Sequence, residues 1–484
     1  IEPQGLKAFA ADCDEILVIE EKRPVIEEQL SHLLYNLPAD RRPRLTGKRD
    51  LSGAPLVAQT GELAPSGVKE ALHRRLAAGG VETRTLAAEA EAQSNAPAAP
   101  VSNLVRTPSF CAGCPHNLST RVPDGSQASG GIGCHGMSGW MKRENSFSQV
   151  PMGNEGIDWV GQSFHTRATH RFQNMGDGTY SHSGYLAIRQ AVASGANLTY
   201  KILYNDAVAM TGGQPVEGGL SVPQIARQLE AAGVQRIAVL APDPSRWRAR
   251  AGEFPPGTRI ASREELDDVQ RALRDTPGVS ALLYDQVCAT EERRRIRRGL
   301  VRPHETRAFI HPDVCENCGD CTARSNCVAI HPIDTPLGRK RRIDPSACND
   351  DLACLPADCP AIVTIEGATP RRWAVDPSHA ASIERAVASL SAPPAWRWTG
   401  PYDLLVAGVG GTGIVTLGAL IVTAAHLEGL AASVLDFTGM AQKGGSVIAY
   451  VRLAADPALL HQTRIDTQQA DAMLACDLVV GASA

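Results

Sequence analysis

The sequence lacks the features that would direct it to nucleic acid or into a membrane. Its 48 lysines and arginines are offset by 52 aspartates and glutamates, so the net charge of −4 gives no sign of a basic surface. The longest apolar run, residues 414–425, is too short to cross a bilayer, and we find no signal peptide. We therefore expect a cytoplasmic protein without nucleic-acid or membrane partners.

The sequence is also a poor candidate for a disulfide framework. Such frameworks are typical of small secreted chains, whereas this chain has 484 residues, 13 cysteines and no export signal. Eleven of the 13 cysteines fall into two groups with ligand-like spacing, and only Cys13 and Cys476 stand apart. Bound metal clusters are therefore the leading interpretation of the cysteines.

An initiating methionine is absent, and the chain ends in the apolar segment "DLVVGASA". We therefore expect a segment of a longer polypeptide. Its apolar content of 43% and charged content of 21% are typical of globular domains with real cores. We find no internal repeat.

The hydrophobic pattern divides the chain into several regions. Strands such as "TYKILYN" alternate with helices such as "SVPQIARQLEAAG" over the middle of the chain, which predicts a parallel, doubly wound sheet. The regions that we expect, in chain order, are the end of an α/β domain (1–48), an irregular segment and linker (49–100), the doubly wound domain (101–300), a Cys-rich module (301–368), a linker (369–400) and the start of a second strand–loop–helix unit (401–484).

The most specific signal is a Gly-Asp-Gly segment followed at a distance by an asparagine. Gly176 and Gly178 let the backbone approach a diphosphate closely, and Asp177 offers a carboxylate oxygen. Asn205 ends the next predicted strand and supplies an amide oxygen. Ligands of a doubly wound sheet bind at the carboxyl ends of its strands, and Mg²⁺ prefers such hard oxygen ligands. The alternative is a simple turn at Asp177 and a cap at Asn205.

A first group of cysteines comprises Cys111 and Cys114 in "FCAGCPHN", Cys134 in "GIGCHG" and Cys288 at the end of a predicted strand. Thiolates on Gly-rich loops are suited to an iron–sulfur cluster, which takes four of them. A CxxC pair alone also fits a zinc site or a redox pair, and zinc stays open as the alternative.

A second group resembles a bacterial two-cluster ferredoxin in its C-x₂-C-x₂-C run and in its last cysteine, which precedes a proline. The resemblance implies one [4Fe–4S] cluster on Cys315, Cys318, Cys321 and Cys359, and a second cluster on Cys327, Cys348 and Cys354. Because seven cysteines are present instead of eight, the second cluster is either [3Fe–4S] or a [4Fe–4S] with Asp350 or Asp351 as a ligand. A zinc ribbon is the alternative.

The segments "NMGDGTYSHSG" and "TGGQP" resemble the thiamine-diphosphate motif of 2-oxoacid:ferredoxin oxidoreductases, and "CAGCPH" with "GIGCHG" is most similar to the indolepyruvate:ferredoxin oxidoreductases. The resemblance implies that Asp177, Asn205 and the carbonyl of Ala207 hold Mg²⁺. It implies further cofactor contacts from Gly176, Gly178, Gly212, Gln214, His116 and His135. The two histidines are equally well read as packed loop residues.

The same resemblance implies the fold and the reaction. It implies an α/β protein with a thiamine-diphosphate-binding doubly wound domain, a small α+β ferredoxin-like module and a partial Rossmann-like gamma-type domain. Region 1–48 is then the end of a transketolase C-terminal-like domain. The implied reaction is the oxidative decarboxylation of an aryl 2-oxoacid to an acyl-CoA, with coenzyme A as co-substrate and ferredoxin as electron acceptor.

The resemblance also implies what lies outside the chain: a pyrimidine-binding domain that carries the activating Glu, and further copies in a homo-oligomer. Another 2-oxoacid, a flavin- or NAD-linked reductase and an electron-transfer subunit with a degenerate thiamine site are the alternatives. The basic run 291–302 is read as a solvated helix face, or as a docking site for an acidic ferredoxin.

Gly408, Gly410 and Gly413 have the G-x-G-x-x-G spacing of a dinucleotide site, with Asp436 at the end of the next predicted strand. By contrast, "GVGGTG" with "GMAQKGGSV" resembles the gamma-type domain of the same oxidoreductases, which carries no dinucleotide. Motif and resemblance therefore give opposite predictions for this loop.

Overall fold

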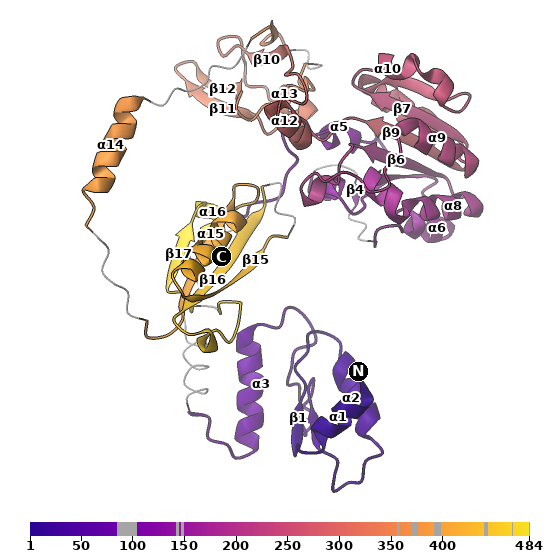
Figure 1. The fold of residues 1–484 in the computed structure, drawn as a ribbon. Helices are drawn as coiled ribbons and strands as arrows, with labels where there is room; N and C mark the ends of the chain where they lie inside the picture. Colours follow the sequence, from indigo (N-terminus) through magenta and orange to yellow (C-terminus); the bar gives the residue numbers. More distant parts are fainter. Residues whose placement is uncertain are drawn as a thin grey trace.

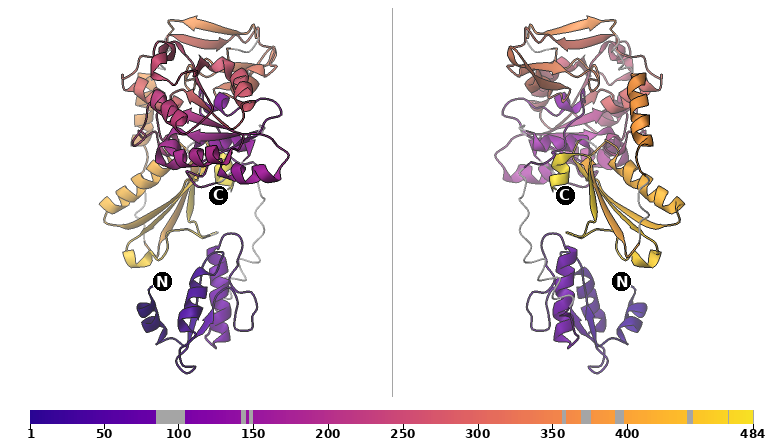
Figure 2. Two further views of the ribbon diagram at one scale, coloured as in Figure 1. Left: turned by 90° about the vertical axis from the view of Figure 1, so that its right-hand side faces the viewer. Right: turned by 90° about the vertical axis from the view of Figure 1, so that its left-hand side faces the viewer.

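The computed structural model describes residues 1–84, 104–141, 145–146, 150–355, 359–368, 376–391, 398–439, 444–466 and 468–483. The described chain folds into an N-terminal unit, a central domain, a small module packed on that domain and a C-terminal unit (Figure 1). The N-terminal unit lies apart from the central sheet in the two further views (Figure 2). None of the described helices combines the length and the apolar composition needed to span a bilayer.

The central domain contains a sheet whose described strands are all parallel. In spatial order these strands are β4 (Asn145–Ser146), β3 (Ala128–Ser129), β5 (Arg171–Gly176), β6 (Leu198–Tyr204), β9 (Val279–Asp285), β7 (Arg236–Ala241) and β8 (Arg259–Ser262). β6 and β9 lie in the middle and are buried along nearly their whole length, as strands covered on both faces must be. The predicted parallel α/β domain is confirmed.

Helices cover both faces of this sheet because successive strand residues point to opposite sides. Ile202 packs with helices α8 (Tyr185–Ser194) and α9 (Val222–Ala231) in one core. Leu203, the next residue, packs in a second core with α11 (Leu266–Arg274). The other α-helices of the domain are α5 (His116–Ser119), α6 (Ile157–Gln162), α7 (Asp177–Thr179), α10 (Ser245–Arg248) and α12 (Ala289–Arg297).

The N-terminal unit has a two-stranded parallel sheet of β1 (Glu15–Leu17) and β2 (Arg44–Thr46). Helices α1 (Pro3–Ala10) and α2 (Val25–Leu34) pack on it, with Leu30 and Leu34 in the core. Residues 49–100 were expected to be irregular, but α3 (Pro65–Ala78) lies there. Proline in the first turn and Gly79 at the end mark this helix in the sequence. Its hydrophobic periodicity is weak, which agrees with Ala71 being its only buried residue. Residues 85–100, the last part of the predicted segment and linker, lie outside the described residues.

The module that follows is built on two antiparallel strand pairs. β10 (Thr306–Ile310) pairs with β13 (Ile362–Glu366), and β11 (Ile330–Thr335) pairs with β12 (Gly338–Ile343). A short helix, α13 (Asp320–Ser325), connects the pairs, and the core is formed largely by cysteines. Beyond the module, α14 (Pro377–Ala388) lies within the predicted linker 369–400, and its described side chains are exposed.

The C-terminal unit is a mixed sheet in the order β15-β16-β14-β17. β14 (Tyr402–Val409) leads into α15 (Ile414–Leu427) and then β15 (Ala431–Phe437). β16 (Ser446–Ala454) lies between β14 and β15 and is antiparallel to both, whereas β17 (Ala472–Ala475) pairs parallel to β14. α16 (Leu478–Ser483) ends the described chain. The two strands that flank the Gly-rich loop and its helix are therefore not neighbours in the sheet.

Candidate functional site

The carboxyl ends of β5 and β6 bring Asp177 and Asn205 together. The two strands are paired along their length, with Gly176 opposite Leu203, so the residues that follow them leave the sheet side by side. The backbone N–H of Asn205 donates to Oδ2 of Asp177 at 3.0 Å, although 28 positions separate the residues. The polar pair thus lies at the edge where doubly wound sheets bind ligands.

Asp177 is a buried carboxyl that is held in place by backbone groups. Its Oδ2 accepts from the N–H of Asn205 and of Asp206, and its Oδ1 accepts from the N–H of Gly178 at 2.9 Å. Burial raises the pKa of Asp177 to about 6, even though these N–H groups act in the opposite direction. A cation bound at this carboxylate would offset the desolvation that raises the pKa.

Asn205 carries a buried oxygen that no described residue uses. The residue is 6% exposed, and its Oδ1 has no hydrogen-bond donor among the described residues. An unsatisfied buried polar atom costs about 1–3 kcal/mol, so such an atom calls for a ligand. An amide oxygen beside a carboxylate fits Mg²⁺. Ala207 is buried two residues further on, after Asp206 turns the backbone with a φ of 57°.

His116 and His135 are both buried beside this pair. Their rings meet edge to face with centroids 5.9 Å apart, and His116 also packs against Phe110. Burial lowers the pKa of His135 to about 4, and its Nε2 has no partner among the described residues. The ring of His135 lies 3.7 Å from where a Cβ on Gly176 would be, which is van der Waals distance, so the imidazole lies beside Gly176. His135 therefore faces the end of β5 as a neutral ring.

The loop 211–214 is arranged differently. Gln214 is exposed, and its side chain bonds to Thr211, donating from Nε2 to the carbonyl at 3.0 Å. The carbonyl of Gly212 accepts a hydrogen bond from Arg294 of α12. The contacts of Gly212 and Gln214 are thus to their own loop and to α12, and a role of either residue in cofactor binding stays a prediction.

The first cysteine group lines one small cavity. Cys111, Cys114, Cys134 and Cys288 all border it, although the last two are far apart in the sequence. Cys288 arrives there because it follows β9, and its N–H donates to the carbonyl of Asn205 at 3.0 Å. Asn205 itself lines the same cavity. The four thiols and Asn205 therefore border one cavity, and Asp177 is joined to it through the N–H of Asn205.

The four thiols of the first group lie close enough to influence one another electrostatically. Burial raises the pKa of the Cys114 thiol strongly, and the other three cysteines raise it further. Among the described residues, no three His, Cys, Asp or Glu side chains are arranged to hold a single metal ion. Zinc needs its ligands on one ion, whereas a [4Fe–4S] cluster spreads four thiolates over its metal corners. The choice between an iron–sulfur cluster and zinc at these thiols stays a prediction.

The second cysteine group forms the interior of the small module. Cys315, Cys321 and Cys354 are buried, Cys318 is exposed, and the other three are partly buried. The Sγ of Cys315 accepts from the N–H of Asn317 and of Arg341, each at 3.4 Å. Such N–H···S bonds are among the features that tune iron–sulfur clusters.

The module is joined to the loop that carries the first group. The N–H of Gly113 donates to the thiol of Cys327, and Asn349 donates from Nδ2 to the carbonyl of Ala112 at 2.7 Å. Asn326 also donates to Asn117 at 2.9 Å. The segments that carry the two cysteine groups are therefore joined by short, direct contacts.

Glu155 is a further buried acid that the sequence analysis did not single out. It is fully buried, its Oε2 accepts from the N–H of Gly153 at 2.7 Å, and its Oε1 has no partner among the described residues. A Cβ on Gly131 would come within 2.8 Å of Glu155 and 3.1 Å of His135 Nε2, so the two side chains approach one point. An acidic residue inside the Gly-rich segment "GNEG" was the available signal.

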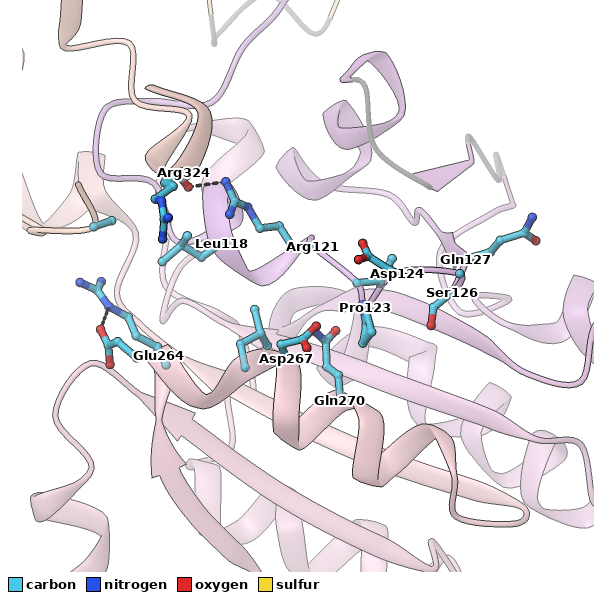
Figure 3. A pocket seen from close by; sticks show the side chains of 15 residues that line it. Leu118, Arg121, Pro123, Asp124, Ser126, Gln127, Glu264, Asp267, Gln270 and Arg324 are labelled. Carbon is cyan, nitrogen blue, oxygen red and sulfur yellow. Dashed lines mark hydrogen bonds and ion pairs between the residues drawn. The ribbon is translucent and has the colours of Figure 1, made fainter. Parts of the chain in front are cut away.

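A larger pocket of about 870 Å³ lies elsewhere, between the loop 121–127 and α11 (Figure 3). Arg121 and Arg324 stand at one side of it, where Arg121 donates to the carbonyl of Arg324. None of the predicted ligands lines this pocket. The size of a pocket therefore does not identify the chemical site here.

The C-terminal Gly-rich loop does not have the geometry of a dinucleotide site. Gly413, with a φ of 99°, begins α15. Oδ1 of Asp436 is buried without a hydrogen-bond partner among the described residues, and it lies 3.8 Å from where a Cβ on Gly418 would be. Gly418 is in the second turn of the helix, so this carboxylate points under α15 instead of toward its N-terminus. β16 also separates Asp436 from β14, which a dinucleotide fold does not allow.

We expect equilibrium titration of the chain with NADH, NADPH and FAD to show no micromolar binding, because β16 separates the strand that ends at Asp436 from β14 and its Gly-rich loop. Fluorescence or calorimetry measures this directly. Micromolar binding that disappears in Gly410→Val would contradict this interpretation and favour the reductase alternative.

The site as a whole defines a class of protein: an α/β fold with a candidate oxygen-ligand site at its strand ends, next to a four-thiol cavity and a cysteine-rich module. Known proteins match both ends of the chain. Residues 1–99 match the family model of the indolepyruvate oxidoreductase domain, and residues 403–481 match that of pyruvate ferredoxin/flavodoxin oxidoreductase.

Curated relatives extend these matches. Indolepyruvate oxidoreductase subunit IorA of Thermococcus kodakarensis is 27% identical over 375 residues, which cover 72% of this chain and 52% of the relative. Subunit IorA of Pyrococcus abyssi is 24% identical over a match that also covers 72% of this chain and 52% of the relative. Subunit IorB of Thermococcus kodakarensis is 37% identical over 78 residues, 16% of this chain and 37% of the relative. The chain is related to the indolepyruvate oxidoreductases, as its motifs predict, and spans about half the length of the curated IorA relatives.

A solved structure also overlaps this chain. It is that of 2-oxoglutarate:ferredoxin oxidoreductase from Magnetococcus marinus with 2-oxoglutarate, coenzyme A and succinyl-CoA bound. The overlap covers 52% of this chain and 87% of the other at 15% identity. Its TM-score of 0.29 is too low to support an argument.

Proposed function

We propose that the chain forms the thiamine-diphosphate-binding and electron-relay part of a 2-oxoacid:ferredoxin oxidoreductase that acts on an aryl 2-oxoacid such as indolepyruvate. The observation that carries the proposal is the buried, unpartnered Oδ1 of Asn205, which lies beside Asp177 and lines the same cavity as four thiols. The relatives named indolepyruvate oxidoreductase support the choice of substrate class.

In this proposal Asp177, Asn205 and the carbonyl of Ala207 hold Mg²⁺ against the diphosphate, and Gly176 and Gly178 let the backbone approach it. Bound thiamine diphosphate supplies the nucleophilic carbon that attacks the 2-oxoacid and the electron sink that makes decarboxylation possible. His135, a neutral ring beside Gly176, and His116 border the cofactor. Their burial helps to exclude water from the site.

The thiolates of the first group hold a cluster next to the cofactor, and those of the module hold the clusters that lead away from it. Cys318 is the exposed member of the module, so its cluster is the natural exit for electrons toward a ferredoxin. Coenzyme A takes the acyl group. The relatives' separate IorA and IorB names favour an assembly of several subunits or domains, with a pyrimidine-binding domain as one of them.

We also propose the assignment of the chain regions: a transketolase C-terminal-like end at 1–48, the diphosphate-binding domain at 101–300, the ferredoxin-like module at 301–368 and a gamma-type domain at 401–484. The family match of residues 403–481 supports the last assignment. The basic helix α12 is not a free face throughout, because Arg293 and Arg294 donate to carbonyls of Ser346 and Gly212.

The substrate class is tested with the whole native protein under argon. We expect indolepyruvate with coenzyme A to bleach the visible absorption of the clusters at least about tenfold faster than pyruvate does, a difference of about 1.4 kcal/mol in the activation barrier. Equal rates for both acids would contradict the aryl preference. Bleaching by NADH alone would contradict the proposed reaction.

A further inference from the structure

The small module has one cysteine fewer than two full ferredoxin clusters require, and the spacing of the second run shows where the replacement stands. In the first run Cys318 lies midway between Cys315 and Cys321, in C-x₂-C-x₂-C spacing. In the second run Cys348 and Cys354 have the same separation, and the midway position is Asp351. A carboxylate therefore occupies the place of the missing thiol.

The structure places the side chain of Asp351 beside one of the thiols that need a fourth partner. The N–H of Gly113 donates to the Cys327 thiol, and the side chain of Asp351 packs against the same Gly113. The Cβ and Cγ of Asp351 lie 3.2 Å from where a Cβ on Gly113 would be, so the side chain is enclosed between the module and the loop of the first cysteine group.

Asp350, the other acid at this place, is already engaged. Its Oδ2 forms an ion pair with Arg307 at 2.5 Å, and its Oδ1 accepts from the thiol of Cys348 at 3.5 Å. The carboxylate of Asp351 forms no ion pair within the described part of the chain, and Arg263 donates to its backbone carbonyl instead. The carboxylate of Asp351 is thus held in no ion pair among the described residues, whereas that of Asp350 is paired with Arg307.

We propose that Asp351 completes the ligand set of Cys327, Cys348 and Cys354, so that the second cluster of the module is a four-iron cluster with one carboxylate ligand. The inference rests on the proposed function only in that the module binds iron–sulfur clusters. Because Gly113 donates to Cys327 and packs against Asp351, this cluster is also the one that adjoins the first cysteine group.

Ligation of one iron of the cluster by a carboxylate instead of a thiolate has a chemical consequence. Thiolate suits the iron of these clusters better than a hard oxygen does, so the iron on Asp351 is held least firmly. Mild oxidation removes it: the [4Fe–4S]²⁺ core gives one electron to ferricyanide, releases Fe²⁺ and becomes [3Fe–4S]⁺. Fe²⁺ and one electron from dithionite restore the original core.

The test uses the whole chain, reconstituted with iron and sulfide under argon and titrated with ferricyanide. Iron content and the electron paramagnetic resonance signal of the three-iron cluster are the readouts. We expect the signal to appear on oxidation of the unaltered chain, to be lost in Asp351→Cys, and to be present before oxidation in Asp351→Ala. Asp350→Asn, the matched control, should behave like the unaltered chain.

Each other outcome overturns the inference. Oxidation behaviour that is the same in the unaltered chain, Asp351→Cys and Asp351→Ala shows that Asp351 is no ligand. A three-iron signal that is present before oxidation in Asp350→Asn but not in Asp351→Ala assigns the fourth ligand to Asp350. Binding of thiamine diphosphate is measured in the same samples. If the samples take up iron and bind the cofactor but substitution of Asp351 does not change the three-iron signal, only the ligand assignment of Asp351 is contradicted. Absence of iron uptake or of cofactor binding contradicts the proposed function itself.

Discussion

We expect Asp177→Ala to abolish the Mg²⁺-dependent binding of thiamine diphosphate, with a loss of affinity of at least about 100-fold. Loss of a residue that only hydrogen-bonds to a metal ligand typically costs about 10- to 100-fold. The carboxylate is the only charged ligand in the proposed set, and it also fixes the N–H groups of Asn205 and Asp206. Calorimetric titration of the anaerobic chain with the cofactor, with and without Mg²⁺, measures the effect. Iron content should stay unchanged.

Two further variants distinguish the loss of a metal ligand in Asp177→Ala from a disturbance of the turn that contains it. Asn205→Ala should also weaken binding, but without lowering the thermal stability of the cofactor-free chain, because it removes an unsatisfied buried oxygen. Asp206→Asn should bind normally, since this neighbouring acid is half exposed and has the positive φ that asparagine tolerates. Normal cofactor binding in Asp177→Ala would refute the assignment of Asp177.

Cys288→Ser removes the cluster of the first cysteine group, and with it the iron and visible absorption of one cluster. Cys288 is the one member supplied by the end of β9, and it lines the cavity with the other three thiols. Serine preserves the size of the side chain but offers a hydroxyl where iron requires a thiolate. Iron and acid-labile sulfide analysis, together with paramagnetic resonance of the reduced chain, gives the count of clusters.

Cys13→Ser serves as the control for that count. Cys13 lies in the N-terminal unit against a core of apolar residues, away from both cysteine groups. Its replacement should leave iron content and spectra as they are. Iron content that stays equal in Cys288→Ser and Cys13→Ser would contradict the four-cysteine cluster.

The meeting of Asp177 and Asn205 was predictable from the sequence because parallel strands end at one edge of a sheet. Each residue directly follows a strongly apolar segment, and adjacent segments of this kind pair in register. The convergence of Cys288 with Cys111, Cys114 and Cys134 rested on family resemblance instead. No local pattern shows that β9 lies beside β6, since that follows from the packing of the whole sheet.

Other features depended on tertiary structure that local sequence does not encode. The G-x-G-x-x-G spacing at 408–413 suggests a dinucleotide site, but the antiparallel β16 inserts between β14 and β15 and Asp436 points under α15. The orphaned oxygens of Glu155 and Asn205 appear only once the surrounding loops are folded. The spacing of Asp351 was visible in the sequence, while the ion pair that sets Asp350 aside was not.

Titration of the anaerobically prepared chain with thiamine diphosphate, carried out with Mg²⁺ and with a chelator, tests the central claim most directly. We predict binding that requires Mg²⁺, is lost in Asp177→Ala and occurs in a sample that also contains iron and acid-labile sulfide. Binding that is indifferent to Mg²⁺ and to Asp177, or a chain that retains flavin or zinc in place of iron–sulfur clusters, would contradict this claim.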